Sequence, residues 1–442
     1  MYNPIQLLVG LLFASFAAAK LSKTSLILYD STYYNLEAGV DSDNDSISTL
    51  SPELLQFIQD LNVKSDVVYD TYDSENVSLF YDEKIRYDNL ILLPNSKKAL
   101  GSKANLNQHQ LLKYLNNNGN ILIVGSIESV LPESFRIFLN ELGIYPSPKN
   151  YKLIDHNNPG KDSQSVKLND DNIKNHKLIP HLDLDYQGSS CLISNNELIF
   201  PIIKSSKTSI TCLKSAKNVE SNNVWGFGEL NYLAVGLQAL NNARLLWIGS
   251  PQLLLPNLTN WVFQHQGQLK LQFVEHINTE SPWIKNPTLY RIKDQLIYTI
   301  GVSELIDNEW KPYEISNQQD SLQLSFKMLD PYQRLDLKPL GPVSSQDNDV
   351  LDTFVYYVNF TLPDHHGMFT FELDYKRYGL SYLQDKRVVT VRHLANDEYK
   401  RSWDITNAWL YVASAGIVVI SWFLFVINYI YVTKVDENKK NI

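Results

Sequence analysis

The chain has few of the residues on which cysteine, metal or phosphate chemistry depends. Only two cysteines occur among 442 residues, and they form no C-x-x-C pair, which excludes a zinc ribbon and thioredoxin-like chemistry. There is no H-E-x-x-H motif and no G-x-S-x-G elbow. "NPGKDS" lacks the spacing of a phosphate-binding loop, and "WGFGELN" lacks the third glycine of a dinucleotide fingerprint. We therefore predict no catalytic residue, no metal site and no cofactor.

An excess of positive charge is also missing. Lys and Arg total 39 against 48 Asp and Glu, which gives a net charge of −9 without a basic stripe. Nucleic acid is therefore not expected as a partner. The acidic run "DSDNDS" at 41–46 is more typical of a solvated loop than of a metal site. His176 and His181 flank Pro180, which is a poor arrangement for a shared metal-binding face.

Two apolar segments predict the topology, and the first lies at the N-terminus. Residues 7–16, "LLVGLLFASF", are too short to span a bilayer, and Ala17 and Ala19 follow with the small side chains that a signal peptidase accepts. We predict a cleaved signal peptide over residues 1–19. Because "MYNPIQ" carries no Lys or Arg, an uncleaved anchor or a buried N-terminal helix is the alternative.

The second apolar segment is a predicted transmembrane helix. Residues 409–432 contain no charged side chain, and at about 1.5 Å per residue they are long enough to cross a ~30 Å hydrocarbon core. Trp409 and Tyr431 suit the two membrane interfaces. Basic residues flank both ends of the span, so the orientation depends on the signal peptide. It predicts a type I protein, with residues 20–403 in the lumen and residues 433–442 in the cytosol.

The predicted lumenal part contains four N-x-[ST] sequons, at Asn44, Asn76, Asn257 and Asn359. A chain rich in Asn, Ser and Thr also produces sequons by chance, so we expect about two to be occupied. Asn359 falls in a predicted strand and Asn257 at a predicted helix start. Both therefore need an outward-facing side chain to be modified.

The two cysteines, Cys191 and Cys212, are expected to form a disulfide, because a pair in an oxidising compartment is more often bridged than free. The bridge would close a loop of about twenty residues and stabilise the fold by about 3 kcal/mol. The intervening segment is typical of two strands around turns, which can bring the sulfurs together. The alternative is two buried thiols.

The hydrophobic periodicity divides the lumenal part into two domains. Residues 20–266 alternate apolar runs such as "SLILYD" and "NLILLP" with helical patterns such as "SPELLQFIQDL" and "NQHQLLKYLNNNG". This pattern predicts an α/β domain with a mostly parallel sheet and helices on its faces. Residues 267–403 alternate with period two, as in "SLQLSFKM", and predict an antiparallel β-sandwich.

In such an α/β domain, ligands gather at the carboxyl ends of the parallel strands. The polar residues expected there are Asp30, Ser126 and Ser250, which follow three predicted strands. None of the three lies in a nucleophile elbow. The motifs therefore favour a binding or scaffolding role over catalysis.

Three stretches carry a resemblance to a known family. "GLQALNNARLLWIGS" (236–250), "YDNLILLPNS" (87–96) and "DYKRYGLSYLQDKRVVTVRHLANDEYKRSW" (374–403) resemble the 48 kDa subunit of the eukaryotic oligosaccharyltransferase. The first stretch is the most specific, and the resemblance extends over nearly the whole chain. It implies membership of an endoplasmic reticulum membrane complex that transfers a preassembled oligosaccharide from dolichyl pyrophosphate to Asn in N-x-[ST].

The resemblance also implies a role within that complex. A separate multi-span subunit carries the active site, so this chain is expected to be a non-catalytic subunit that supports assembly, stability and substrate positioning. The implied partners are that catalytic subunit, a ribophorin-II-like subunit, a small multi-span subunit and membrane lipid. The family's N-terminal domain is similar to glutamine-amidotransferase-like domains. No cysteine stands at a strand-to-helix elbow here, so amidotransferase chemistry is not expected. The alternative function is a lumenal glycan-binding or cargo-receptor protein acting outside the transferase.

The chain ends "DENKKNI", which places Lys439 and Lys440 in a K-K-x-x-COOH arrangement. Paired lysines in a polar tail usually add only solubility. With type I topology and the resemblance, they predict a retrieval signal that the coatomer reads, which is an address and not an anchor.

The predicted span also has features of a docking surface. Ala413, Ser414, Ala415 and Gly416 surround a single turn, where a neighbouring backbone can approach closely, and Asn428 is a polar group near the far interface. We therefore predict that the helix packs against other subunits. The alternative is an ordinary single-pass helix with tolerated small residues.

Overall fold

The structure is a computed structural model of the chain. It describes residues 23–34, 51–74, 77–100, 106–162, 165–215, 223–306, 309–315, 320–344, 351–399 and 407–439. The predicted signal peptide lies outside the described residues, as do Asn44, Asn76 and Lys440.

The first domain is built on a nine-stranded sheet, and five of its strands are parallel in the order β2-β1-β5-β6-β16. Four of the five are short apolar runs buried along nearly their whole length, as expected for parallel strands with both faces covered. The parallel strands are β1 (Thr24–Tyr29), β2 (Asp66–Thr71), β5 (Asn89–Leu92), β6 (Asn120–Val124) and β16 (Arg244–Ile248).

The other half of this sheet is antiparallel. β15 (Tyr232–Gln238) pairs antiparallel with β16, and β11 (Cys191–Ile193), β12 (Ile199–Lys204) and β7 (Ile144–Pro146) continue the pattern. The sheet is therefore mixed, rather than mostly parallel as predicted. The reason is local: a short turn, with Asn242 at φ 66°, joins β15 directly to β16, and so short a connection only allows antiparallel pairing.

The helices form where the periodicity predicted them. In α2 (Pro52–Lys64), Leu54, Phe57, Ile58 and Leu61 are buried, and Pro52 occupies the first turn, where its missing N–H costs nothing. The other helices are α3 (Gln108–Asn116), α4 (Glu133–Leu142) and α5 (Pro256–Val262). α3 ends before the predicted Gly119, because Asn118 already takes a left-handed conformation with φ 70°.

Small elements surround this sheet. They are the pair β3 (Phe80–Tyr81) and β4 (Lys84–Ile85), the pair β9 (Val166–Leu168) and β10 (Leu184–Tyr186), the three-stranded sheet of β8 (Tyr151–Ile154), β13 (Ile210–Leu213) and β14 (Val224–Phe227), and the 3-10 helices η2 (Asp170–Asn172), η4 (Gly228–Leu230) and η5 (Pro251–Leu253).

The second domain, called the β domain here, consists of two five-stranded sheets that share one buried cluster of apolar side chains. One sheet contains β17 (Gln268–Asn278), β19 (Gln295–Ile306), β20 (Glu309–Pro312), β23 (Lys338–Val343) and β24 (Thr353–Thr361). The other contains β18 (Leu289–Arg291), β21 (Gln323–Lys327), β22 (Pro331–Asp336), β25 (Gly367–Tyr375) and β26 (Leu383–Arg392). Period-two burial is clear in β21, where Leu324 and Phe326 are fully buried. β18 pairs with β26 in parallel, so the domain is not antiparallel throughout.

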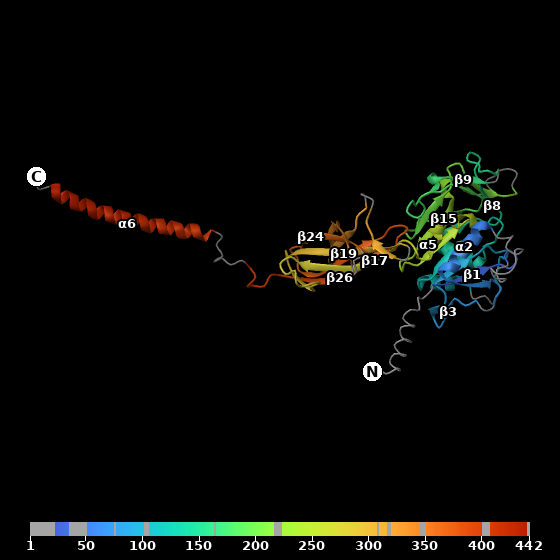
Figure 1. Ribbon diagram of the computed structural model, residues 1–442, viewed down its shortest axis with the longest axis horizontal. Coiled ribbons are helices and arrows are strands. Elements are labelled where there is room, and N and C mark those ends of the chain that lie inside the picture. The colour runs from blue at the N-terminus through green and yellow to red at the C-terminus, as the bar shows by residue number, and fades with distance from the viewer. Residues whose placement is uncertain are drawn as a thin grey trace, which may run out of the picture.

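A single apolar helix, α6 (Ala408–Lys439), follows the β domain, and its first 24 residues, Ala408–Tyr431, are long and apolar enough to cross a membrane. In Figure 1, β1 and α2 belong to one body, β19 and β26 belong to another, and α6 stands apart from both.

The predicted disulfide is wrong for this structure. Cys191 and Cys212 are both buried, free thiols. Cys191 lies in β11 of the large sheet, whereas Cys212 lies in β13 of the three-stranded sheet, so the two residues do not share a ladder. Burial raises the pKa of both thiols, and that of Cys191 rises far above its ordinary value.

Candidate functional site

Asp30, the first candidate, lies at the carboxyl end of β1 and makes hydrogen bonds within the protein. Its carboxylate accepts hydrogen bonds from the Thr32 backbone N–H at 2.9 Å, from the Ser96 backbone N–H at 2.8 Å and from the Ser96 hydroxyl. Burial by itself would raise the pKa of Asp30, but these hydrogen bonds outweigh it and lower the pKa. Asp30 therefore ties the loop after β1 to the loop after β5, inside the stretch 87–96 that carries part of the resemblance.

The other two candidates also serve local turns. The Ser126 backbone N–H donates to Ser129 Oγ at 3.1 Å, and the Gln252 backbone N–H donates to Ser250 Oγ at 3.4 Å, which caps η5. Across the described ranges, no group of three or more His, Cys, Asp and Glu side chains could hold a metal ion. Asp30, Ser126 and Ser250 each take part in a local loop or turn contact, and none of these hydrogen bonds joins one of the three to another.

A cavity of about 540 Å³ lies beside this edge, among the loop after β6, α4, β7 and β14. Trp225 and Tyr145 line it together with the cationic Lys98, Arg136 and Lys149. These residue types bind ligands through ring faces and charge, but the lining contains neither His nor Cys. Glu133 also lines the cavity, so it offers aromatic faces and charges of both signs to a bound ligand.

The stretch with the most specific resemblance, 236–250, lies at the joint between the two domains. Its Arg244 is fully buried at the start of β16. The guanidinium donates to the carbonyl oxygens of Trp261 at 2.6 Å, Gln266 at 2.7 Å and Gly267 at 2.7 Å. It also lies 5.1 Å from the centre of the Trp261 ring. Burial lowers the pKa of Arg244 to about 9. One buried cation thus fixes the chain where it passes from α5 to β17.

The loop between β25 and β26 completes this joint. Trp261 Nε1 donates to the Gly379 carbonyl at 3.1 Å, and Gln238 Nε2 donates to the Leu380 carbonyl at 2.8 Å. Gly267 has φ +69°, and a side chain there would collide with the Gly379 carbonyl. The two domains therefore meet through specific hydrogen bonds from side chains of the first domain to main-chain carbonyl groups of the second, and not through a flexible linker alone.

Aromatic packing adds to the same joint. The Phe200 ring stacks on Tyr378 at 5.2 Å and meets Trp261 edge-on at 5.4 Å. The Tyr382 backbone N–H donates to Asn242 Oδ1 at 2.7 Å. Offset and edge-on ring pairs contribute about 0.5–1.5 kcal/mol each beyond the area that they bury. We call the contacts of Arg244, Trp261 and residues 378–382 the domain joint.

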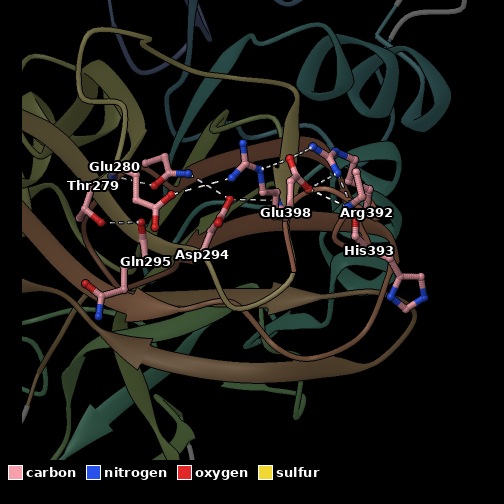
Figure 2. A network of polar contacts seen from close by, with 10 residues as sticks. Thr279, Glu280, Asp294, Gln295, Arg392, His393 and Glu398 are labelled. Carbon is pink, nitrogen blue, oxygen red and sulfur yellow. Dashed lines mark hydrogen bonds and ion pairs between the residues drawn. The ribbon is translucent and has the colours of Figure 1, made fainter. Parts of the chain in front are cut away.

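A second joint lies at the far end of the stretch 374–403, where the chain leaves the β domain toward α6. Glu398 accepts a two-pronged hydrogen bond from Arg392, with both N···O distances 2.8 Å, and its Oε1 lies 3.1 Å from Arg291 Nε (Figure 2). The Ala395 backbone N–H donates to Glu398 Oε2 at 2.7 Å. The hydrogen bonds from Arg392 and Ala395 lower the pKa of Glu398 to about 2. We call this contact set the Glu398 clasp.

Asp294 holds the main chain of Arg291, one of the residues that contact Glu398. Its Oδ2 accepts hydrogen bonds from the Arg291 backbone N–H at 2.8 Å and from Asn278 Nδ2 at 3.0 Å. Burial raises the pKa of Asp294 in spite of these bonds. Figure 2 shows Asp294 between Glu280 and the Arg392–Glu398 pair. The network fixes residues 393–399 against β18 and β26.

The remaining predicted residues fall at scattered places. Asn359 is exposed on β24, whereas Asn257 is half-buried in the first turn of α5. Lys439 is the last residue of α6.

The small residues of α6 are all exposed on this helix: Ala413, Ser414, Ala415, Gly416 and Asn428. The Ser414 hydroxyl donates to the Tyr411 carbonyl one turn back at 2.9 Å. The hydroxyl group of this turn is therefore already hydrogen-bonded within α6.

Sequence reasoning did not single out Arg244 or Glu398. Both lie within the stretches that carry the resemblance, and one local signal was present. "NARLLWIG" places an arginine at the start of an otherwise apolar, buried strand. A buried guanidinium requires several hydrogen-bond acceptors around it, so an arginine at this place in the sequence indicates a position with specific polar contacts.

Comparisons with known proteins give the family. Residues 22–279 match the model of "OST48, N-terminal domain", and residues 275–433 match "OST48 middle domain". The chain is 34% identical over 450 residues to the dolichyl-diphosphooligosaccharide–protein glycosyltransferase subunit WBP1 of Saccharomyces cerevisiae, covering 97% of this chain and 95% of that protein. It is 30% identical to the corresponding wbp1 subunit of Schizosaccharomyces pombe, covering 92% and 93%.

More distant similarities were also found. The chain is 26% identical to the 48 kDa subunit of the same enzyme in Drosophila melanogaster, covering 87% of this chain and 88% of that protein. Among solved structures, the mmIFT52 N-terminal domain aligns with a TM-score of 0.36 and 14% identity, covering 55% of this chain and 96% of that one.

Proposed function

Because the chain belongs to the OST48 family of oligosaccharyltransferase subunits, we propose that it is the structural scaffold of that glycosyltransferase complex. One observation carries the proposal: the stretches 236–250 and 374–403, which carry much of the resemblance, build the domain joint and the Glu398 clasp. These residues fix the positions of the two domains and of the segment that leads to α6. A subunit that is rigid in this way is suited to fixing the positions of other subunits. Catalysis belongs to a different subunit.

The joints give this scaffold its stiffness. A hinge between domains usually works through few contacts and solvent-exposed polar groups. Here the joint contains a fully buried arginine with three carbonyl partners and a buried tryptophan that donates across the domains. Breaking the joint would leave several buried acceptors without a donor, at about 1–3 kcal/mol each. The domain joint is therefore expected to stay closed while partners bind.

The finer fold assignment is part of the proposal. We assign residues 20–266 to an α/β domain of the glutamine-amidotransferase-like kind, without that chemistry, and residues 267–403 to a β-sandwich. The strand order β2-β1-β5-β6-β16 supports the first assignment, because it is a doubly wound order. The shared core of two five-stranded sheets supports the second.

The topology is also proposed. A signal peptide over residues 1–19, the span within α6 and a ten-residue tail give a type I protein of the endoplasmic reticulum membrane, with both domains in the lumen. The exposed side chain of Asn359 supports this placement, because glycan addition requires an outward-facing asparagine. In the cytosolic tail, Lys439 and Lys440 would serve retrieval by the coatomer.

The proposed partners lie in the membrane and beside it. They are the catalytic multi-span subunit, a ribophorin-II-like subunit and a small multi-span subunit. The exposed turn from Ala413 to Gly416 supports helix packing, since its small side chains let a neighbouring helix approach closely. Replacement of the span by a poly-Leu helix should then release the protein from the complex.

Copurification in mild detergent tests the proposal. The chain should elute with multi-span subunits that transfer oligosaccharide to an N-x-[ST] peptide, whereas the chain alone should transfer none. A chain that elutes alone and binds free glycans would instead be a lumenal lectin or cargo receptor.

A further inference from the structure

One end of the β domain exposes large apolar side chains on several turns and strand ends. The exposed fractions are 90% for Leu329, 77% for Trp283, 65% for Met368, 52% for Leu289 and 47% for Met328. We call these five residues the span-side tip. A single exposed apolar side chain is ordinary, but several that gather at one end of a domain mark a contact site for a protein or a membrane.

The strand register places these residues at the same end. Trp283 lies in the loop after Asn278, the last residue of β17, which pairs with Leu296 near the start of β19, and Leu296 pairs with Phe360 near the end of β24. Gly367 pairs with Val391, and Leu289 pairs with Thr390, so β18, β25 and β26 all reach this end together. A carbon added at Gly367 would lie 3.0 Å from the Met328 sulfur, which brings the β21–β22 turn to the same place.

Ring contacts confirm this arrangement. His366, in the turn before β25, lies 4.0 Å from His393 between ring centres, and His393 directly follows β26. Tyr332 of β22 meets His365 edge-on at 5.7 Å. The β21–β22 turn, the β24–β25 turn and the end of β26 therefore form one surface.

The chain leaves the domain toward the membrane from this surface. The Glu398 clasp holds residue 398 against Arg392 and Arg291. Figure 2 shows Arg392 and Glu398 beside His393. The apolar helix begins at Ala408, ten residues later. A fully extended chain covers about 3.3–3.6 Å per residue, so the start of the span lies within ~36 Å of the clasp.

We propose that the span-side tip rests on the lipid bilayer around α6, with its apolar side chains among the headgroups. Trp283 suits this position, because tryptophan concentrates at membrane interfaces, where its ring is apolar and its N–H remains wet. Leu329 and Met368 supply protruding apolar groups that can enter between lipids. The nearby Lys293 is 65% exposed at its side chain and is paired with Asp364 at 2.7 Å, so the tip carries both signs and does not depend on anionic lipid.

The length of the tether favours lipid over a protein partner. Because the tether keeps the clasp within ~36 Å of the start of its own span, the tip can reach the bilayer without any further partner. The inference rests on α6 being embedded in a membrane and not on the subunit role, so it can fail while the proposed function stands.

The test places a fluorescent label on the tip of the full chain. Leu329→Cys in the purified complex would carry a thiol-linked fluorophore, because Cys191 and Cys212 are buried and should not react. The complex is reconstituted into phosphatidylcholine vesicles with or without lipids that carry a nitroxide near the headgroup. We expect the nitroxide lipids to abolish most of the fluorescence at 329, and iodide in solution to have little effect there.

Leu351→Cys is the matched control. Leu351 is 51% exposed and precedes β24, at the opposite end of the strand from the tip, so its label should respond to iodide and not to nitroxide lipids. The proposal is overturned if the label at 329 responds to iodide as the control does. It is equally overturned if neither quencher reaches 329, because that outcome assigns the tip to a protein subunit.

Discussion

Ser190 Oγ and Thr211 Oγ1 lie 2.6 Å apart, and both residues are fully buried. Each directly precedes one of the two cysteines. Successive side chains of an extended chain point to opposite sides, so the contact between Ser190 and Thr211 turns Cys191 and Cys212 away from each other. The hydroxyl groups of Ser190 and Thr211, and not the two sulfurs, therefore occupy the facing positions.

This arrangement predicts that the cysteines stay reduced even in an oxidising compartment. Without denaturant, a maleimide should label neither cysteine, since burial raises the pKa of both thiols and blocks access. In denaturant without a reductant, both should react, as mass spectrometry would report. If the denatured protein is labelled only after a reductant is added, the native protein contains a disulfide between Cys191 and Cys212.

The domain joint predicts a large effect of Arg244. Arg244→Met keeps an apolar stem over Trp261 but leaves three carbonyl oxygens without their donor, so the free energy of unfolding should fall by about 1–3 kcal/mol for each of them, several kcal/mol in all. Limited proteolysis should also begin to cut near Gln266. Arg136→Met is the control, because Arg136 is half-exposed with only a 4.0 Å ion pair, and its effect should stay within about 0.5 kcal/mol. Equal effects of the two substitutions would contradict a special role for the joint.

The clasp predicts a defined acid dependence. The pKa of Glu398 falls from its ordinary 4.5 to about 2 in the fold, so the ionised form is favoured there. Its contribution to stability is therefore fully present above about pH 4.5 and is lost as the pH falls toward about 2. The stability difference between wild type and Glu398→Gln should be constant at neutral pH and vanish across this window. Asp397→Asn, at the exposed neighbour, should show no such difference.

The two described sequons should differ in occupancy under the proposed topology. Asn359 is exposed on β24, and we expect it to carry a glycan. Asn257 is half-buried, and the hydroxyl of its sequon partner Thr259 donates to the Pro256 carbonyl at 3.0 Å, so it should remain unmodified. Peptide mapping after enzymatic deglycosylation would measure both. A glycan at Asn257 and none at Asn359 would show that modification precedes folding of these elements.

The tail prediction separates retrieval from retention by partners. Lys439→Ser together with Lys440→Ser removes two charges from the end of the chain and should leave stability unchanged. At normal expression the protein should stay in the endoplasmic reticulum, held by its complex, whereas overexpressed excess should acquire Golgi-type glycan processing. Two residues appended after Ile442 should act in the same way, because the signal is counted from the carboxylate. Identical processing of excess mutant and excess wild type would reduce the lysines to a solvated tail.

The sequence alone determined the elements whose burial depends on local spacing. β1, β6 and α2 formed where apolar runs or helical periodicity placed them, and the β24–β25 turn formed at the polar residues Asp364–Gly367. α6 followed from length and composition. In each case a stretch of chain presents its own apolar face, so neighbouring residues decide the outcome.

Only the tertiary structure decided which segments meet. β15 runs antiparallel to β16, β18 runs parallel to β26, and Arg244 reaches carbonyl groups 17 to 23 residues away in sequence. The two cysteines likewise point apart because of a contact between their neighbours. Such outcomes depend on the path of the whole chain. The burial of a charge or a thiol is set by residues that approach only after the sheets have formed, and a local pattern carries no information about that approach.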